Sequence, residues 1–249
     1  FNNIEIKAGG LNHLSILLEV KYKDTQKDGY PKIHKKMKRY YSQLLAEYGY
    51  PSKPGSERGV FFKLYELYGY LPITTDSHLG EYIQWAHSVC DHEAIVEFYD
   101  NYKNYCLSYY HDSSYQEFFN LNVREPNERI VPIIEAILNN SNMHELAVNL
   151  PNKGFINCIS EDIVVEIPAI INKSGVKGQN LKNYPKSFAT ILNNQVGTIQ
   201  LTTEAVLKKS KQLAYLAMLA DPVINDTKAA SNILQTMIDF QKDYLGYLK

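Results

Sequence analysis

Two short polar stretches of the sequence combine residue types that can do chemistry. Residues 74–82 read Thr-Thr-Asp-Ser-His-Leu-Gly-Glu-Tyr and follow a predicted helix that stops at Gly69. Residues 9–13 read Gly-Gly-Leu-Asn-His and interrupt two strand-like segments. A loop carboxylate such as Asp76 can act as a general base near a substrate proton, and a neutral imidazole such as His13 can bind a divalent metal. We therefore expect the two stretches to form one composite site.

The same residues also have structural interpretations. Asp76 or Ser77 can cap a helix that continues through Glu81 and Trp85, because a short polar side chain at an N-cap accepts a backbone N–H bond. A single histidine beside a strand, such as His13, is more often a hydrogen-bonded structural residue than a metal ligand. The residues alone leave both interpretations open.

A second group of metal-binding residue types is formed by His87, Cys90 and His92. Its spacing matches none of the usual zinc patterns, so we expect these residues on the surface of a helix or turn. The three cysteines, Cys90, Cys106 and Cys158, are odd in number and lack Cys-x-x-Cys spacing. They indicate neither a disulfide framework nor a structural zinc site, and they favour a reducing cytoplasm.

The composition narrows the classes of function. With 249 residues, 45% hydrophobic residues and a formal net charge of -1, the chain is an ordinary globular sequence without a broad positive field. We expect neither nucleic-acid binding nor a membrane span, because the basic run at 35–39 suits a solvated helix face and the apolar runs are too short. Gly-x-Gly-x-x-Gly, Walker and Gly-x-Ser-x-Gly motifs are missing from the sequence, so the chain supplies no recognised nucleotide loop or serine nucleophile.

The periodicity predicts one α+β domain over residues 1–249, with a small antiparallel sheet packed by several helices. Thr202 or Thr203 is expected to cap one helix and Asp226 another. The aromatic helix at 93–110 is expected to contribute core or subunit contacts. The expected strands are 4–8, 14–22, 145–150, 155–159 and 163–171, and the expected helices are 29–41, 58–68, 93–110, 126–138, 185–194, 204–220 and 228–244.

Taken together, several segments resemble family 4 of the glycoside hydrolases. They occur in that family's order and span nearly the whole chain: Gly-Leu-Asn-His at 10–13, Thr-Asp-Ser-His-Leu-Gly-Glu-Tyr at 75–82, Asn-Leu-Pro-Asn-Lys-Gly at 149–154, Val-Val-Glu-Ile-Pro at 164–168, and Leu-Thr-Thr-Glu-Ala at 201–205 through Asp-Pro at 221–222. The first two motifs are fairly specific in combination. The resemblance implies a C-terminal domain like that of lactate and malate dehydrogenases.

The resemblance also implies a reaction and a set of roles. Family members hydrolyse glycosides by NAD-dependent oxidation, elimination and addition, and a divalent metal, usually Mn²⁺, polarises the sugar oxygens. By analogy, His13 would bind the metal, Asp76 would be the base at sugar C2, and Asn12, His78 and Asn152 would contact substrate. Members that cleave phosphorylated sugars tend to have a tyrosine base, so an aspartate favours an unphosphorylated α-galactoside, α-glucoside or uronide.

The sequence departs from the family at its N-terminal side. Family members carry a Rossmann domain with the glycine-rich NAD loop and a cysteine metal ligand upstream of the Gly-x-Asn-His element. Only twelve residues precede His13, and they contain no cysteine. We therefore expect residues 1–249 to be the C-terminal substrate- and metal-binding part, which is inactive alone. We expect the missing Rossmann domain to be its partner. The assembly is expected to be a homo-oligomer, either a dimer or a tetramer.

Two other classes of protein stay open. One is a non-catalytic oligomerisation or sugar-binding module, with the Tyr-rich helix at 93–110 as its partner surface. The other is the C-terminal domain of a hydroxy-acid dehydrogenase. Such enzymes use a His/Asp pair and an arginine that binds the substrate carboxylate, whereas Arg58, Arg124 and Arg129 lie outside any such motif.

Overall fold

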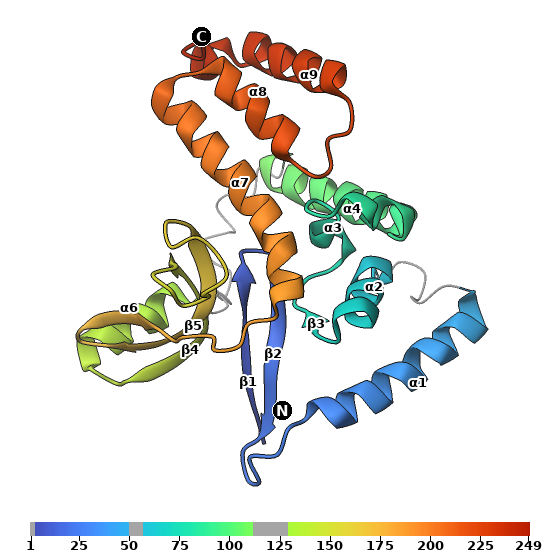
Figure 1. Ribbon diagram of the computed structural model, residues 1–249, viewed down its shortest axis with the longest axis vertical. Helices are drawn as coiled ribbons and strands as arrows, with labels where there is room; N and C mark the ends of the chain where they lie inside the picture. Colours follow the sequence, from blue (N-terminus) through green and yellow to red (C-terminus); the bar gives the residue numbers. More distant parts are fainter. Residues whose placement is uncertain (1–2, 50–56, 112–128) are drawn as a thin grey trace.

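A six-stranded antiparallel sheet lies at the centre of the computed structural model, which describes residues 3–49, 57–111 and 129–249 (Figure 1). The strand order is β3-β2-β1-β5-β4, and β6 pairs with β5. The predicted α+β class with a small antiparallel sheet is confirmed. The strands are β1 Ile4–Leu11, β2 Leu14–Tyr22, β3 Leu71–Pro72, β4 Met143–Pro151, β5 Val164–Asn172 and β6 Gly175–Gly178.

The sheet register aligns three strands beside the tip of the β1–β2 hairpin. Leu11 pairs with Leu14 across the tip, and Gly10 pairs with Glu166 of β5, which itself pairs with Asn149 of β4. Gly10 has to be a glycine, because a Cβ there would lie 2.3 Å from the backbone oxygen of Leu14. The close approach keeps the two strands of the hairpin tight at its tip, and the pairing of Gly10 with Glu166 places the tip beside β5.

The helices surround this sheet and extend beyond it (Figure 1). The long helix α7 runs from the hairpin towards α8 and α9, α6 packs on β5, and α1 projects from the other side. The helices are α1 Tyr30–Tyr48, α2 Gly59–Tyr68, α3 Asp76–Leu79, the 3-10 helix η1 Gln84–Ser88, α4 His92–His111, α6 Ile130–Asn139, α7 Lys186–Lys208, α8 Lys211–Ala220, α9 Thr227–Phe240 and α10 Lys242–Leu245.

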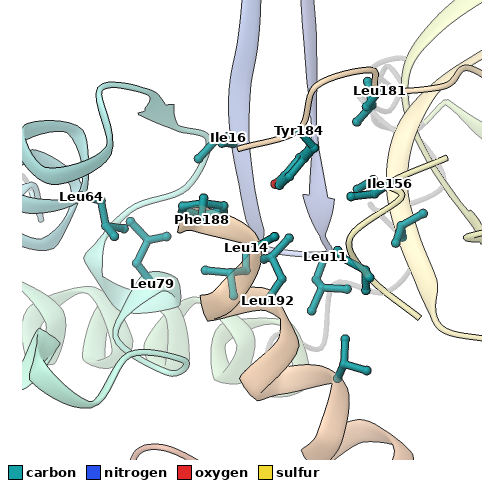
Figure 2. Close-up of a cluster of buried hydrophobic side chains, with 14 of the residues drawn as sticks. Leu11, Leu14, Ile16, Leu64, Leu79, Ile156, Leu181, Tyr184, Phe188 and Leu192 are labelled. Atoms are coloured by element: carbon teal, nitrogen blue, oxygen red, sulfur yellow. The ribbon is translucent and has the colours of Figure 1, made fainter. Parts of the chain in front are cut away.

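The main hydrophobic core fixes the hairpin relative to the helices (Figure 2). Leu14 of the hairpin, Phe188 of α7 and Leu79 of α3 are all fully buried. Burying each such side chain contributes about 1.5 to 3 kcal/mol. The core therefore holds α3, α7 and the hairpin tip in one rigid arrangement.

Three predicted elements are corrected by the structure. Residues 155–159 form no strand; Ile156 and Ile159 are buried in a loop instead. The predicted break before residue 204 is wrong, because α7 runs unbroken to Lys208, and the hydroxyls of Thr202 and Thr203 donate to carbonyls four residues back rather than capping a helix. Ser210 caps α8 instead, and the predicted Asp226 cap of α9 is confirmed.

The structure also bears on the remaining predicted elements, the cysteines and the possibility of a membrane span. The predicted start of a helix at residue 126 lies outside the described residues, and β6 was not predicted. Cys90, Cys106 and Cys158 are all free thiols. Within the described ranges, every helix is too short or too polar to cross a membrane.

Candidate functional site

The Asn12-His13 turn at the hairpin tip meets the 74–82 stretch. His13 adopts a φ of 62°, in the left-handed region that few non-glycine residues occupy, and its side chain is exposed. The Thr74 hydroxyl donates a 2.8 Å hydrogen bond to the backbone oxygen of His13. The imidazole ring centres of His13 and His78 lie 4.3 Å apart. The structure thus brings the two polar stretches together.

His78 lies in the last turn of the short helix α3 and is half-buried. Its Nδ1 atom is buried and has no hydrogen-bond partner among the described residues; the nearest carboxylate oxygen, on Glu81, lies 3.9 Å away. Buried polar atoms are normally hydrogen-bonded. His78 therefore has unused hydrogen-bonding capacity directly beside His13.

Glu166 supports the turn from the neighbouring strand. Its Oε1 accepts a 3.1 Å hydrogen bond from the Ser15 hydroxyl, and its Oε2 lies 3.4 Å from Nδ2 of Asn12. No role was predicted for Glu166 from the sequence. The available signal was a single acid within the apolar run Val-Val-Glu-Ile-Pro-Ala-Ile-Ile at 164–171. Because the Glu166 carboxylate contacts both the Ser15 hydroxyl and the Asn12 amide, it restricts the orientation of the Asn12 amide.

Asp76 occupies a different environment from the turn. Its side chain is completely buried, and its two carboxylate oxygens accept 3.0 Å hydrogen bonds from the backbone N–H groups of Val60 and Phe61 in the first turn of α2. Burial raises the pKa of the Asp76 carboxyl, while these N–H bonds oppose that shift. The geometry favours the capping interpretation, although the capped helix is α2 rather than the one that follows.

A second carboxylate makes the reciprocal contact at this junction. Glu57, just before α2, accepts a 3.0 Å hydrogen bond from the backbone N–H of Ser77 at the start of α3. Each of the two helices α2 and α3 thus receives a carboxylate at its N-terminus from the segment of the other, which suits the positive end of a helix. The pair fixes α3, and with it the position of His78.

Asn152 organises the loop that precedes β5. Its side chain is fully buried, and its amide nitrogen lies 3.0, 3.0 and 2.9 Å from the carbonyl oxygens of Ile156, Ile159 and Ser160. Its amide oxygen accepts a 2.8 Å bond from the N–H of Ile156. The Asn152 amide is used within the chain to hold this loop, and its predicted contact with substrate stays a prediction.

A cavity of about 490 Å³ opens beside the hairpin tip. It lies between the tip, the start of β5, the end of β4 and one side of α7. The polar residues in its wall are Asn12, Tyr82, Asn149, Asp162, Gln195 and Thr203. Asn12 is shared between this cavity and the turn that carries His13.

The donor atoms present make only part of a metal site. A neutral imidazole is a common ligand of divalent metals, and His13 and His78 place two together. Among the residues that the structure describes, no group of three or more His, Cys, Asp or Glu side chains is arranged to hold a metal ion. The chain fits a metal only as a contributor of imidazole to a ligand set completed from elsewhere.

The second histidine and cysteine cluster spans the end of η1 and the start of α4. Cys90 Sγ lies 3.4 Å from Nε2 of His92, and that nitrogen lies 2.8 Å from the backbone oxygen of His87. Burial raises the pKa of the Cys90 thiol, which disfavours the thiolate that metals and electrophiles require. The contacts among His87, Cys90 and His92 are therefore those of local packing between η1 and α4.

Comparison with known proteins relates the chain to glycoside hydrolases by sequence and to glucosidases by fold. Residues 8–224 match the model of the family 4 glycosyl hydrolase C-terminal domain. The chain is 38% identical to an α-glucosidase of Erwinia rhapontici, covering all of this chain and 58% of that protein. It is 26% identical to an α-galacturonidase of Thermoanaerobacterium saccharolyticum, covering 97% of this chain and 54% of that protein. The chain therefore spans little more than half the length of these relatives.

Two solved structures share the fold. One is a 6-phospho-α-glucosidase from gut microorganisms in complex with NAD and Mn²⁺, with a TM-score of 0.72 and 22% identity over 100% of this chain and 57% of that one. The other is the 6-phospho-β-glucosidase of Thermotoga maritima with NAD and glucose 6-phosphate, with a TM-score of 0.67 and 20% identity over 97% and 55%. At these identities the structures establish the fold alone. The family match over most of the chain shows that this protein belongs to glycoside hydrolase family 4, with the family's C-terminal domain at residues 8–224.

Proposed function

We propose that this chain is the substrate- and metal-binding part of an NAD-dependent glycosidase that hydrolyses an α-galactoside, α-glucoside or α-uronide. The observation that carries the proposal is the pairing of His13 and His78 at the exposed hairpin tip. The exposed imidazole of His13 and the unsatisfied Nδ1 of half-buried His78 lie together and are available to a bound group, and the family consists of glycosidases. The curated relatives, an α-glucosidase and an α-galacturonidase among them, support the reaction class.

We assign His13 as the metal ligand, because its imidazole is exposed on a turn whose backbone is held in place. A divalent ion such as Mn²⁺, when bound, would act as a Lewis acid on the substrate's hydroxyl oxygens. The remaining ligands would come from outside the described residues. The sequence has no glycine-rich phosphate loop, so NAD does not fit this chain alone, and we propose that a Rossmann domain outside residues 1–249 binds it.

The other polar residues of the hairpin tip would orient the sugar. Asn12 has its amide nitrogen directed at Glu166, which leaves the amide oxygen as an acceptor for a sugar hydroxyl. His78 offers its unsatisfied Nδ1. Both groups lie where the family's substrate contacts are expected, and both are held by rigid neighbours, as a positioned site requires.

Asp76 and Asn152 take different roles in this proposal. The role of Asp76 as the base at C2 stays a prediction, and its geometry supports a structural contribution, because a base must reach the substrate proton and this carboxylate is buried against α2. We propose that Asp76 positions α3, and through it His78, and that Asn152 positions the loop before β5.

Hydrolysis of 4-nitrophenyl α-glycosides tests the proposed function. The assay uses the chain joined to its nucleotide-binding part, with NAD⁺ and Mn²⁺ present together or omitted in turn. We expect release of nitrophenol only when both are present, together with incorporation of solvent deuterium at sugar C2. Hydrolysis without NAD⁺, or without deuterium at C2, would contradict the redox mechanism; loss of activity in His13→Ala with retained folding would support the metal assignment.

We also propose that the chain assembles as a homo-oligomer through α4. Phe98, Tyr102 and Tyr105 lie along one face of α4 and are exposed, and exposed apolar patches of this kind are typical of association surfaces. Light scattering on the purified chain tests this proposal. A monomer at all concentrations would contradict it, and a dimer or tetramer that Tyr102→Glu dissociates would support it.

A further inference from the structure

Two exposed helices carry charges of opposite sign. Apart from histidine, the charged residues of α1 between positions 30 and 46 are all cations, and all of them are exposed: Lys32, Lys35, Lys36, Lys38 and Arg39. The charged residues of α4 between positions 93 and 102 are all acids, and all of them are exposed: Glu93, Glu97 and Asp100. The formal net charge of the whole chain is only -1. The two helices therefore separate positive from negative charge within a nearly neutral molecule.

The charges of the two helices repeat with the same spacing. Three cations of α1 and three acids of α4 each follow an i, i+4, i+7 pattern, which places each set on one helix face: Lys32, Lys36 and Arg39 on the first, and Glu93, Glu97 and Asp100 on the second. Seven residues of α-helix span about 10 Å along the axis. When the two helices lie side by side, each cation can therefore reach one acid.

These two faces are not neutralised within the chain. Among the described residues, none of the six side chains forms an ion pair, whereas other exposed lysines do, such as Lys63 with Glu66. The helices α1 and α4 stand apart in Figure 1, on either side of α2 in that view. The positive and negative faces therefore do not meet within one copy of the chain.

Packing directs the positive face of α1 outwards. Tyr41 and Leu44 of α1 are buried beside Tyr65 of α2, and the helical period places the cations on the opposite side of α1. Each charged face also has an apolar neighbour. Tyr40, one turn from Lys36, is 46% exposed, and Val96, one turn before Asp100, is 60% exposed. Because exposed ion pairs are individually weak, this apolar surface is needed for a stable contact.

We propose that α1 of one copy of this chain docks on α4 of a second copy, and that the reverse contact forms at the same time about a two-fold axis. Such an interface is self-complementary, because each copy supplies one positive and one negative face. A polyanion such as nucleic acid would match α1 but would be repelled by α4, whereas a second copy matches both. Complementary charge then sets the orientation and the choice of partner.

This contact deepens the proposed assembly through α4, and it rests on that proposal for the existence of a homo-oligomer. The proposed glycosidase activity does not depend on it. The partner surface is now α1, which was not assigned before, and the interface is expected to be sensitive to salt because its ion pairs are exposed.

Sedimentation velocity on the 249-residue chain tests the contact by exchanging charges. One double variant, Lys36→Glu with Arg39→Glu, makes α1 acidic, and the other, Glu97→Lys with Asp100→Lys, makes α4 basic. In either variant alone, like charges oppose each other at both contacts, so the dimer dissociation constant should rise at least about tenfold. Mixing the two variants should restore a dimer that contains one of each, because both contacts then pair opposite charges.

Two controls separate this contact from a general effect of charge. Lys228→Glu with Lys242→Glu changes the net charge by the same amount as the α1 variant, at exposed positions of α9 and α10, and should leave the dimer unchanged. Raising the salt from about 0.1 M to about 1 M shortens the screening length from about 10 Å to about 3 Å and should weaken the native dimer. The salt experiment needs no variant, and circular dichroism checks that each variant is folded.

The possible results separate the proposals. Native dimers that persist in both charge variants, or folded variants that stay monomeric when mixed, would overturn the contact between α1 and α4. If Tyr102→Glu dissociates the oligomer and the charge variants do not, assembly through α4 stands and the role of α1 is wrong. A native chain that stays monomeric but binds a DNA duplex through α1 would overturn both assembly proposals and assign α1 to a polyanion. None of these results changes the outcome of the hydrolysis assay, which tests the glycosidase proposal separately.

Discussion

The hairpin tip and the α2–α3 junction contain the same kinds of residue but use them differently. At the tip, His13 is exposed and the Nδ1 atom of His78 has no hydrogen-bond partner among the described residues. At the junction, Asp76 and Glu57 are buried, and both are bonded to the backbone of a helix start. The hairpin tip has unused hydrogen-bonding groups, whereas the carboxylates of the α2–α3 junction are already hydrogen-bonded to the backbone and hold the fold.

These two regions separate residues that are available for chemistry from residues that hold the fold. A residue type with catalytic potential needs an accessible atom whose bonds are not already made within the chain. His13 and Asn12 meet that requirement, and Asp76 and Asn152 do not. The comparison therefore predicts opposite mutational responses: loss of stability at the junction and the Asn152 loop, and loss of ligand binding at the tip.

The largest effect is expected for Asp76→Ala. Removing the carboxylate leaves two buried N–H groups of α2 without acceptors, so the free energy of unfolding should fall by about 3 to 4 kcal/mol. Urea denaturation followed by circular dichroism measures it, with Asp239→Ala on the exposed face of α9 as the control. Unchanged stability combined with lost turnover would instead restore Asp76 as the base.

Asn152→Ala should cost almost as much. Three backbone carbonyls and one N–H of the 152–163 loop would lose a buried partner, which predicts a loss of about 3 kcal/mol. The same denaturation experiment applies, and Asn180→Ala, whose exposed amide makes a single 3.3 Å bond to Gly154, serves as the matched control. A stable Asn152→Ala protein with weakened sugar binding would show that the residue contacts substrate after all.

A smaller effect is expected for Glu166→Gln. The glutamine keeps the shape and one acceptor oxygen but loses the charge, so unfolding should become easier by about 1 kcal/mol. The Asn12 amide would lose its fixed orientation, so neutral-sugar binding should weaken more than stability does. If the binding free energy of the neutral sugar falls by no more than the free energy of unfolding does, Glu166 has a purely structural role.

The smallest effect on stability is expected for His13→Ala. Its side chain is exposed and makes no side-chain hydrogen bond within the described residues, so the free energy of unfolding should change by less than about 0.5 kcal/mol. Thermal unfolding measures this change. A large loss would show that the ring contact with His78 holds the hairpin, contrary to the comparison.

The sequence predicted the strands β1, β2, β4 and β5 and most helices, because their apolar periodicity matches the faces that pack on the core, as at residues 14–22 and 163–171; it missed β3 and β6. It failed at 155–159, where two isoleucines point inward from an irregular loop whose shape is set by the buried Asn152 amide. It also failed inside α7, where Thr202 and Thr203 bond backwards along the helix, a choice that local residue type does not decide.

The site was predicted in part. Local motif chemistry identified the Asn12-His13 turn and the 74–82 stretch, and the family resemblance joined them. The partner of Asp76 lies on α2, sixteen residues earlier, and the partner of Glu166 lies on another strand, 151 residues earlier. Such long-range contacts follow from the sheet register and helix packing, which a single sequence does not display.

Manganese titration followed by NMR of the histidine side chains tests the central claim most directly. The chain carries seven histidines, so each imidazole can be assigned by single substitution. Paramagnetic Mn²⁺ should broaden the resonances of His13 first and then those of His78, at concentrations that leave His87, His92 and His144 sharp. Broadening that begins at His87 and His92, or that spares His13, would contradict the assignment of the hairpin tip as the functional site.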